Sequence, residues 1–414
     1  MKLALCGMSA LRVLRDLRQR HVDVMRLPRV DLPAPSLEGS GRWSRAAISQ
    51  AIEQYPCLAD FSERHPLCVA VPTAATRLRV KGVSCTVHGK GLPANAFVDV
   101  GGGLFISSPE LLFIELAGIM LPEVHLVVGM ELCGTYARDA SDPRNGSVAY
   151  QIPAVTCMDR IRAFVDGCHH VNGLGPARET LEWLLDNAWS PMEAVVAAMA
   201  VLPGAMLGYD LWPIDLNVPV DARGGTASGT RIPDLVFRGT DVGLNYDGEG
   251  HLPLQDVVDA AIRLASLPQE RATQEDLDDA LRRAREGAVA DKRRDRDLGA
   301  AGLTVFAMTK EDLYERGGLD RLMLQVMDAI SRTGKRDLSR QRTMMESKLL
   351  GDLRQELIWS FLPGKVGQEA AQTFAELSAP NPDITRYMKI ARFVDGKWVV
   401  SLVERSSSAA LPGD

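Results

Sequence analysis

The sequence contains no CxxC pair, although it has seven cysteines. Paired cysteines at that spacing are typical of zinc ribbons and thiol redox motifs, so their absence argues against both classes. An odd number of scattered cysteines is best explained by free thiols in a reducing compartment, and we expect a cytoplasmic protein. Cys157 with Cys168, His169 and His170 is the one cluster of metal-ligating residue types worth naming, and its spacing matches no common zinc site.

The chain also lacks any run of the ~18 apolar residues that a membrane span requires, so no membrane association is expected. It has no excess of basic residues, since its formal net charge is −6. This charge argues against a protein that coats nucleic acid over its whole surface, but it allows a local basic face. Basic residues do cluster, at Arg282 to Arg285 and at Lys292 to Arg296, where a solvated helix surface is the plainer explanation.

The length of 414 residues, with 46% hydrophobic and 24% charged residues, predicts two or three folded domains. Helical and strand patterns both occur, which predicts an α/β (α+β) fold. The expected regions are an N-terminal helical segment (1–66), a β-rich region (67–150), a helical bridge (151–189), a domain at 190–330 with a helical insertion at 252–290, and C-terminal helices with a hairpin (331–414).

The stretch Ile232–His251 predicts two β-strands joined by a tight turn, because β-branched and aromatic residues are bounded by Gly, Asp and Thr. Asp234 begins the first strand, and Asp247 lies just past the second. Neighbouring antiparallel strands bring such side chains together, and two carboxylates with a carbonyl make a hard oxygen site of the kind that holds Mg²⁺. The alternative is a surface hairpin with a solvated aspartate at each end.

The flanking motifs extend this pattern. Ser190 and Glu193 form a capping-box pattern before an apolar helix, and a charged helix from Asp291 to Leu298 leads through glycines into a strand. The order of these motifs over residues 190–313 resembles the PD-(D/E)XK nuclease-like domains related to the very-short-patch-repair endonuclease. This resemblance implies a restriction-endonuclease-like core, in which a mixed sheet is flanked by helices.

The resemblance also implies roles for individual residues. The matching metal-binding and catalytic acids are Glu193, Asp234 and Asp247, which would hold Mg²⁺ or Mn²⁺. The helix motif and the histidine after Asp-Gly imply nucleic-acid contacts by Lys292, Arg293, Arg294, Arg296 and His251.

The main departure from the family pattern is Asn245, which stands where a glutamate is expected. An amide oxygen can still ligate a metal but contributes no charge, so both metal affinity and water activation are weakened. Glu249 lies two residues past Asp247 and could substitute. The insertion at 252–290 could clamp nucleic acid or block the site.

A second resemblance lies upstream. Short strands from Leu67 to Ile106 are followed by Ser108, Pro109 and Glu110, which cap an apolar helix. This arrangement resembles the middle region of AbiEi-type regulators or antitoxins of bacterial abortive-infection systems. A plain apolar helix with a good N-terminus explains the same residues.

Three functions follow from these observations. The first is a metal-dependent nuclease that acts on DNA in bacterial defence or repair, and the second is a non-catalytic DNA-binding regulator built on a degenerate nuclease fold. The third is a protein that binds a partner protein of a defence or toxin–antitoxin locus. Convergence of Glu193, Asp234 and Asp247 on one point would favour the first.

Overall fold

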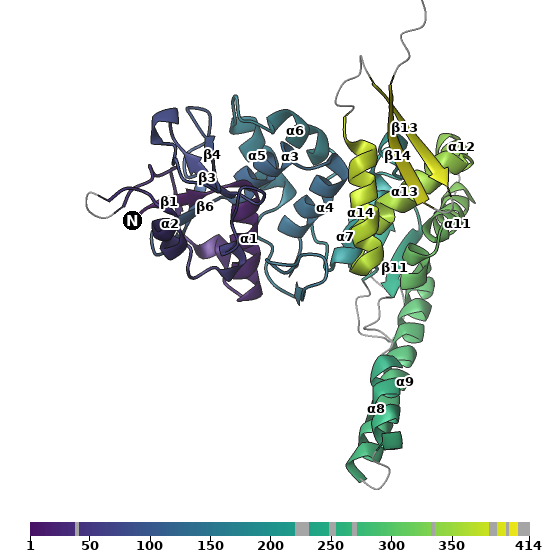
Figure 1. The fold of residues 1–414 in the computed structure, drawn as a ribbon. Coiled ribbons are helices and arrows are strands. Elements are labelled where there is room, and N and C mark those ends of the chain that lie inside the picture. The colour runs from purple at the N-terminus through teal and green to yellow at the C-terminus, as the bar shows by residue number, and fades with distance from the viewer. Residues whose placement is uncertain are drawn as a thin grey trace, which may run out of the picture.

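The computed structural model describes residues 1–37, 41–219, 232–247, 254–266, 271–332, 336–380, 387–394 and 397–404. The structure has two lobes that lie side by side (Figure 1). Each lobe contains a mixed sheet that is covered by helices. The N-terminal lobe holds a six-stranded sheet and helices α1 to α6, and the C-terminal lobe holds a four-stranded sheet and helices α7 to α14. The α+β fold expected from the sequence is therefore confirmed.

The N-terminal sheet is built around the first strand of the chain. Strand β1 (Leu3–Leu5) pairs in parallel with β6 (Leu104–Ser107) and antiparallel with β3 (Leu67–Val71). The sheet order is β2-β5-β6-β1-β3-β4, completed by β2 (Arg29–Val30), β4 (Val83–Val87) and β5 (Phe97–Gly101). The boundary expected at residue 66 thus falls inside one sheet, and the first 66 residues are not a purely helical segment.

Helix α3 (Pro109–Ala117) forms the centre of the N-terminal lobe, and all of its residues are buried. Its start follows from the sequence, because Pro109 occupies the first turn and the Ser108 hydroxyl accepts a hydrogen bond from the Leu111 N–H. A helix that is apolar on every side must be surrounded by protein. The helices that contact it are α1 (Gly7–Gln19), α4 (Pro122–Leu132), α5 (Met158–Gly167) and α6 (Leu174–Leu181), and α2 (Arg45–Ala51) completes the helices of the lobe.

Buried glutamates on α3 and α4 tie this lobe together. Glu131 accepts two hydrogen bonds from the Arg15 guanidinium, at 2.9 and 2.6 Å, and Glu110 pairs with Arg29 at 2.7 Å. Because a buried carboxylate without a cation is costly, each pair requires both of its members. These contacts hold α1 against α4 and β2 against α3.

The C-terminal lobe contains the expected meander. Strands β9 (Ile214–Leu216), β10 (Leu235–Phe237) and β11 (Val242–Asp247) are consecutive and antiparallel, and β12 (Thr304–Thr309) lies parallel to β11. Helix α7 (Pro191–Val201) contacts β9, and α11 (Gly318–Arg332) contacts β11 and β12. The remaining helices are α10 (Lys310–Tyr314), α12 (Ser339–Met345), α13 (Lys348–Phe361) and α14 (Gly364–Ser378).

The connection between β11 and β12 forms a helical hairpin that projects away from both lobes (Figure 1). It consists of α8 (Leu254–Ser266) and α9 (Arg271–Ala300). The insertion expected at 252–290 is thus helical, but α9 does not end at its boundary. It continues without a break through the charged motif, so the expected insertion and the basic helix form one 30-residue rod.

The C-terminal hairpin predicted from Asp395 and Gly396 is confirmed by its strands, β13 (Tyr387–Val394) and β14 (Lys397–Glu404), while the turn residues themselves lie outside the described part of the chain. Two short strands, β7 (Tyr136–Ala137) and β8 (Ala149–Tyr150), bracket a loop between the lobes. Within the ranges described, no helix is long and apolar enough to cross a membrane.

The buried His125 makes the stability of the N-terminal lobe depend on pH. Its Nε2 lies 2.8 Å from the Phe113 carbonyl oxygen, and burial lowers the pKa of His125 to about 4. A histidine with a depressed folded pKa binds its proton more readily when unfolded, so stability is lost as pH falls from the unfolded pKa towards 4. Urea denaturation should therefore give a free energy of unfolding about 2 kcal/mol lower at pH 5 than at pH 7 from this residue.

The variant His125→Gln keeps an N–H donor for the Phe113 carbonyl and should lose this part of the pH dependence. His65 is exposed, and the matched change His65→Gln should leave the pH profile as in the wild type. An unchanged profile in His125→Gln would contradict the assignment.

Candidate functional site

The candidate site lies at one edge of the four-stranded sheet. Strand β10 pairs with β11 so that Leu235 faces Leu244, and continuing this register places Asp234 opposite Asn245. On the other side, the Asn217 N–H donates to the Asp234 carbonyl at 3.1 Å. Residues opposite one another in a sheet project from the same face. Asn217, Asp234 and Asn245 therefore form a polar row across three strands.

Asp234 is held by hydrogen bonds to the end of β11. Its Oδ2 accepts from the Tyr246 N–H at 2.6 Å, and its own N–H donates to Asn245 Oδ1 at 3.2 Å. These two hydrogen bonds join β10 and β11 at the open end of the hairpin, opposite its turn. The carboxylate expected to bind metal thus has a structural role at the strand ends.

Asn245 is 1% exposed, which makes it one of the most deeply buried polar residues of the lobe. Its Oδ1 accepts from the Asp234 backbone, and its Nδ2 has no hydrogen-bond partner in the described structure. The unpartnered atom is a hydrogen-bond donor, as assigned from the contact made by Oδ1. A buried N–H donor repels a cation, so this amide does not replace the glutamate as a ligand.

Asp247 lies two residues further along β11, on the same face as Asn245. Its Oδ1 is 3.7 Å from Nη2 of Arg294, which reaches it from α9. The Arg294 side chain is 20% exposed, and its buried Nε has no partner among the residues described. Arg294 therefore places a positive charge beside Asp247, where the resemblance implied a metal ion.

Glu193 is connected to the row through Asn217. The Ser190 hydroxyl accepts from the Glu193 N–H at 3.2 Å, as the capping pattern predicted. Glu193 Oε2 accepts from the Trp189 N–H and from Asn217 Nδ2, both at 2.9 Å. The structure thus brings Glu193, Asp234 and Asp247 to one region, but each carboxylate contacts protein donors.

Asn217 was not identified from the sequence. It is 3% exposed, and its Nδ2 donates both to Glu193 and to the Asn187 carbonyl at 2.8 Å. The register of the strands could have revealed it. Asn217 comes directly after β9 and Asp234 comes directly before β10, so antiparallel pairing of the two strands places these residues opposite each other.

Among the described residues, the donor set does not form a divalent-cation site. Within the described ranges, no group of three or more His, Cys, Asp or Glu side chains is arranged to hold a metal ion, and this includes the cysteine–histidine cluster at residues 157–170. Mg²⁺ prefers several oxygen ligands directed at one point. Glu249 and His251 lie outside the described residues.

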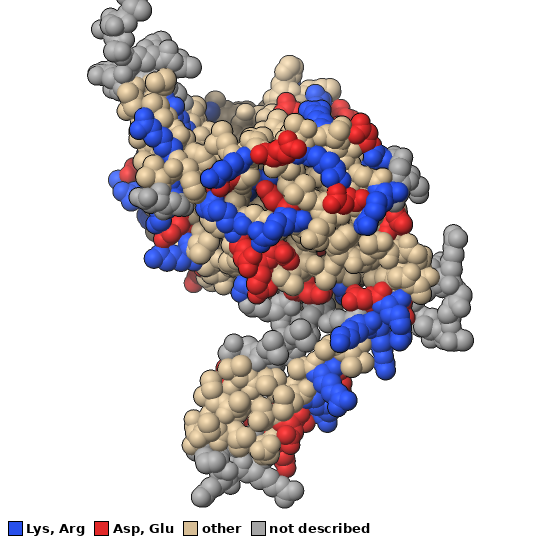
Figure 2. Space-filling model, turned by 90° about the vertical axis from the view of Figure 1, so that its right-hand side faces the viewer, with Lys and Arg blue, Asp and Glu red and all other residues tan. Residues whose placement is uncertain are grey.

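Among the described residues that were expected to contact nucleic acid, only Arg294 reaches the site. Lys292, Arg293 and Arg296 are exposed on α9. Figure 2 shows Lys and Arg side chains gathered along one edge of the projecting hairpin. The basic motif therefore divides into one residue that faces the sheet and three that face solvent.

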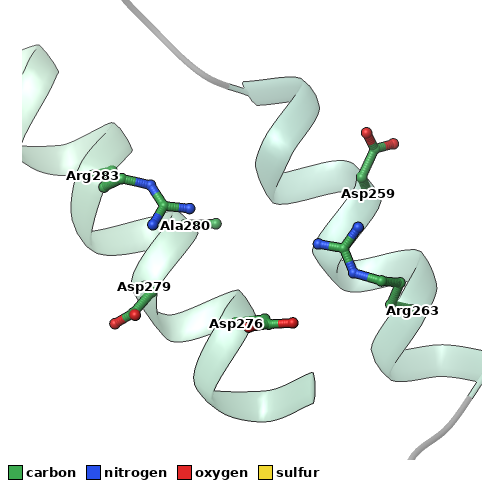
Figure 3. Close-up of a pocket in the computed structure, with 6 residues that line it drawn as sticks. All are labelled: Asp259, Arg263, Asp276, Asp279, Ala280 and Arg283. Carbon is green, nitrogen blue, oxygen red and sulfur yellow. The ribbon is translucent and has the colours of Figure 1, made fainter. Parts of the chain in front are cut away.

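A small charged cleft of about 200 Å³ lies between α8 and α9. Figure 3 shows the guanidinium of Arg263 in the space between the two helices. The cleft is lined by Asp259, Arg263, Asp276, Asp279, Ala280 and Arg283. Its acids and arginines offset one another, which suits a contact that joins the two helices.

A much larger groove of about 1280 Å³ runs between the lobes and ends at the candidate site. One wall comes from residues 135–153 of the N-terminal lobe, and the other comes from the start of α7 with Tyr246, Lys310 and Tyr314. Glu193 lines the same groove. Glu193 and Tyr246 therefore line a wide groove, while Asn217 and Asn245 of the polar row are buried behind them.

In comparisons with known proteins, no protein-family description, no curated protein and no solved structure matches the chain.

Proposed function

We propose that this protein is a DNA-binding regulator that uses the basic face of α9 and keeps a nuclease-like domain without cutting. The proposal rests on the way in which the side chains of the polar row and Asp247 are already paired with protein groups. Asn245 occupies the glutamate position, is buried, and uses its oxygen to hold Asp234, while Arg294 lies beside Asp247.

Phosphodiester cleavage by a metal-dependent site requires a cation that lowers the pKa of a bound water and stabilises charge on the phosphate. The cation in turn requires carboxylate oxygens that are directed at it. Here Asp234 accepts from a backbone N–H and Asp247 faces a guanidinium. The groups that stabilise the two aspartates, a backbone N–H for Asp234 and the Arg294 guanidinium for Asp247, come from the protein itself, so the residues favour a stable scaffold over a reactive centre.

DNA binding is supported by the shape and charge of α9. A 30-residue helix is ~45 Å long and 10–12 Å wide with its side chains, which matches the ~12 Å width of the major groove. Lys292, Arg293 and Arg296 are exposed along it, and the hairpin projects clear of both lobes (Figures 1 and 2). Backbone phosphates would be neutralised by these side chains.

An Mg²⁺- or Mn²⁺-dependent endonuclease is the second candidate. It is favoured by the placement of Asp234 and Asp247 at the same sheet edge, with Glu193 one hydrogen bond from the row. This candidate requires the carboxylates to exchange their present protein donors for a metal ion.

The double variant Lys292→Gln/Arg293→Gln tests the binding surface. Loss of two phosphate contacts should weaken duplex binding and reduce the slope of log K against log salt concentration by ~1.8. Fluorescence anisotropy over a series of salt concentrations measures both effects. The control Lys81→Gln/Lys365→Gln removes the same charge from exposed lysines outside α9. Equal slopes in the two double variants would contradict the assignment of α9.

A plasmid assay tests the absence of cutting. Supercoiled DNA incubated with the protein and Mg²⁺ or Mn²⁺ should stay supercoiled, because the candidate ligands are occupied by protein donors. Nicking by the wild type that disappears in both Asp234→Ala and Asp247→Ala would support the endonuclease instead. Nicking that persists equally in both variants would indicate a contaminant.

A further inference from the structure

The groove between the lobes is larger than a usual small-molecule site. Small-molecule sites usually enclose ~300–1,000 Å³, whereas this groove offers about 1280 Å³. Its two walls come from parts of the chain that are far apart in sequence, the loop at residues 135–153 and the C-terminal lobe. A groove of this size that is open to solvent suits an extended ligand.

Four aromatic side chains line the groove, each from a different place in the fold. Tyr150 lies on β8 and is 54% exposed, and Trp189 precedes α7 and is 39% exposed. Tyr246 on β11 and Tyr314 on α10 are half-buried. Exposed aromatic rings along a groove are the usual platform on which unpaired bases stack.

The charges in the groove are mainly positive. Arg138, Arg144 and Lys310 line it together with one acid, Glu193. Arg144 donates to the carbonyl oxygens of Ser360 and Leu362, at 2.8 and 2.7 Å, which fix the guanidinium without neutralising it. Burial and the neighbouring Arg138 lower the pKa of Arg144. Such a site favours an anionic ligand.

Aromatic and cationic groups also lie in contact on the C-terminal wall. The Lys310 ammonium is 5.2 Å from the centre of the Tyr314 ring. A base stacked near this ring would bring its phosphate within reach of the lysine, so one wall offers both elements of nucleotide recognition.

From these observations we propose that the groove binds a single-stranded nucleic-acid segment, with bases stacked on Tyr150 and Trp189 and phosphates near Lys310 and Arg138. The segment would lead towards Glu193 and the polar row. This proposal deepens the DNA-binding function proposed above and assigns the single strand to a surface separate from α9.

Anisotropy of a fluorescein-labelled oligothymidylate tests the proposal. Tyr150→Leu and Trp189→Leu should each weaken binding about tenfold, because each removes a stacking surface. Trp189→Phe keeps a ring and should retain most of the affinity. Trp212 is 41% exposed and does not line the groove, so Trp212→Leu is the matched control and should bind as the wild type does.

Lys310→Gln should reduce the salt slope of oligothymidylate binding by ~0.7, the value for one phosphate contact with a single strand. Circular dichroism melting of each variant ensures that a loss of binding is not a loss of folding. Free thymidine monophosphate is the second ligand, and it should bind far more weakly than the oligonucleotide. Equally tight binding of the monophosphate would overturn the assignment to a strand.

The variants distinguish binding in the groove from binding on α9. Groove variants should lose oligothymidylate binding and keep duplex binding, whereas Lys292→Gln/Arg293→Gln should do the reverse. Absence of oligothymidylate binding by the folded wild type, or binding that Trp189→Leu and Trp212→Leu change equally, would overturn the groove proposal. Either result leaves the duplex assay to decide the function of α9.

Discussion

The row of hydrogen bonds from Asn217 through Asp234 to Asn245 is the constraint on which the C-terminal lobe depends. It joins three strands at the edge where they leave the sheet, and it reaches α7 through Glu193. A buried polar network stabilises a fold only when its members are satisfied, and Asn245 Nδ2 and Asn217 Oδ1 are exceptions in the described structure.

Charge placement distinguishes the polar row from the metal-dependent site that the sequence resemblance implies. A catalytic site needs acidic groups that repel one another until a cation joins them. Here an amide, Asn245, lies beside Asp234, and Arg294 supplies a cation from α9. The same helix carries Lys292 and Arg293 on its exposed face. A single helix therefore places one arginine beside Asp247 and presents other basic side chains to solvent.

Local patterns in the sequence predicted much of the C-terminal lobe. The Ser190–Glu193 cap and the strands on either side of residues 238–241 follow from turn and capping chemistry within a few residues. Contacts between residues that are far apart in the sequence could not be predicted from local patterns. The partner of β1 lies about a hundred residues away in β6, and Asp247 meets Arg294 across the whole projecting hairpin. The length of α9 was missed because the insertion at 252–290 and the charged helix from Asp291 were treated as separate elements. Gly287 lies inside α9, and its cost of ~1 kcal/mol is too small to end a helix that is otherwise rich in good helix formers.

The account rests on the claim that protein donors, and not a metal ion, satisfy the carboxylates of Asp234 and Asp247. Titration of Mn²⁺ into the protein, followed by electron paramagnetic resonance, measures this directly, because bound Mn²⁺ loses the sharp spectrum of the free ion. The account predicts the same free-ion signal for the wild type and for Asp234→Ala at every Mn²⁺ concentration. A stoichiometric loss of signal in the wild type that Asp234→Ala abolishes would contradict it.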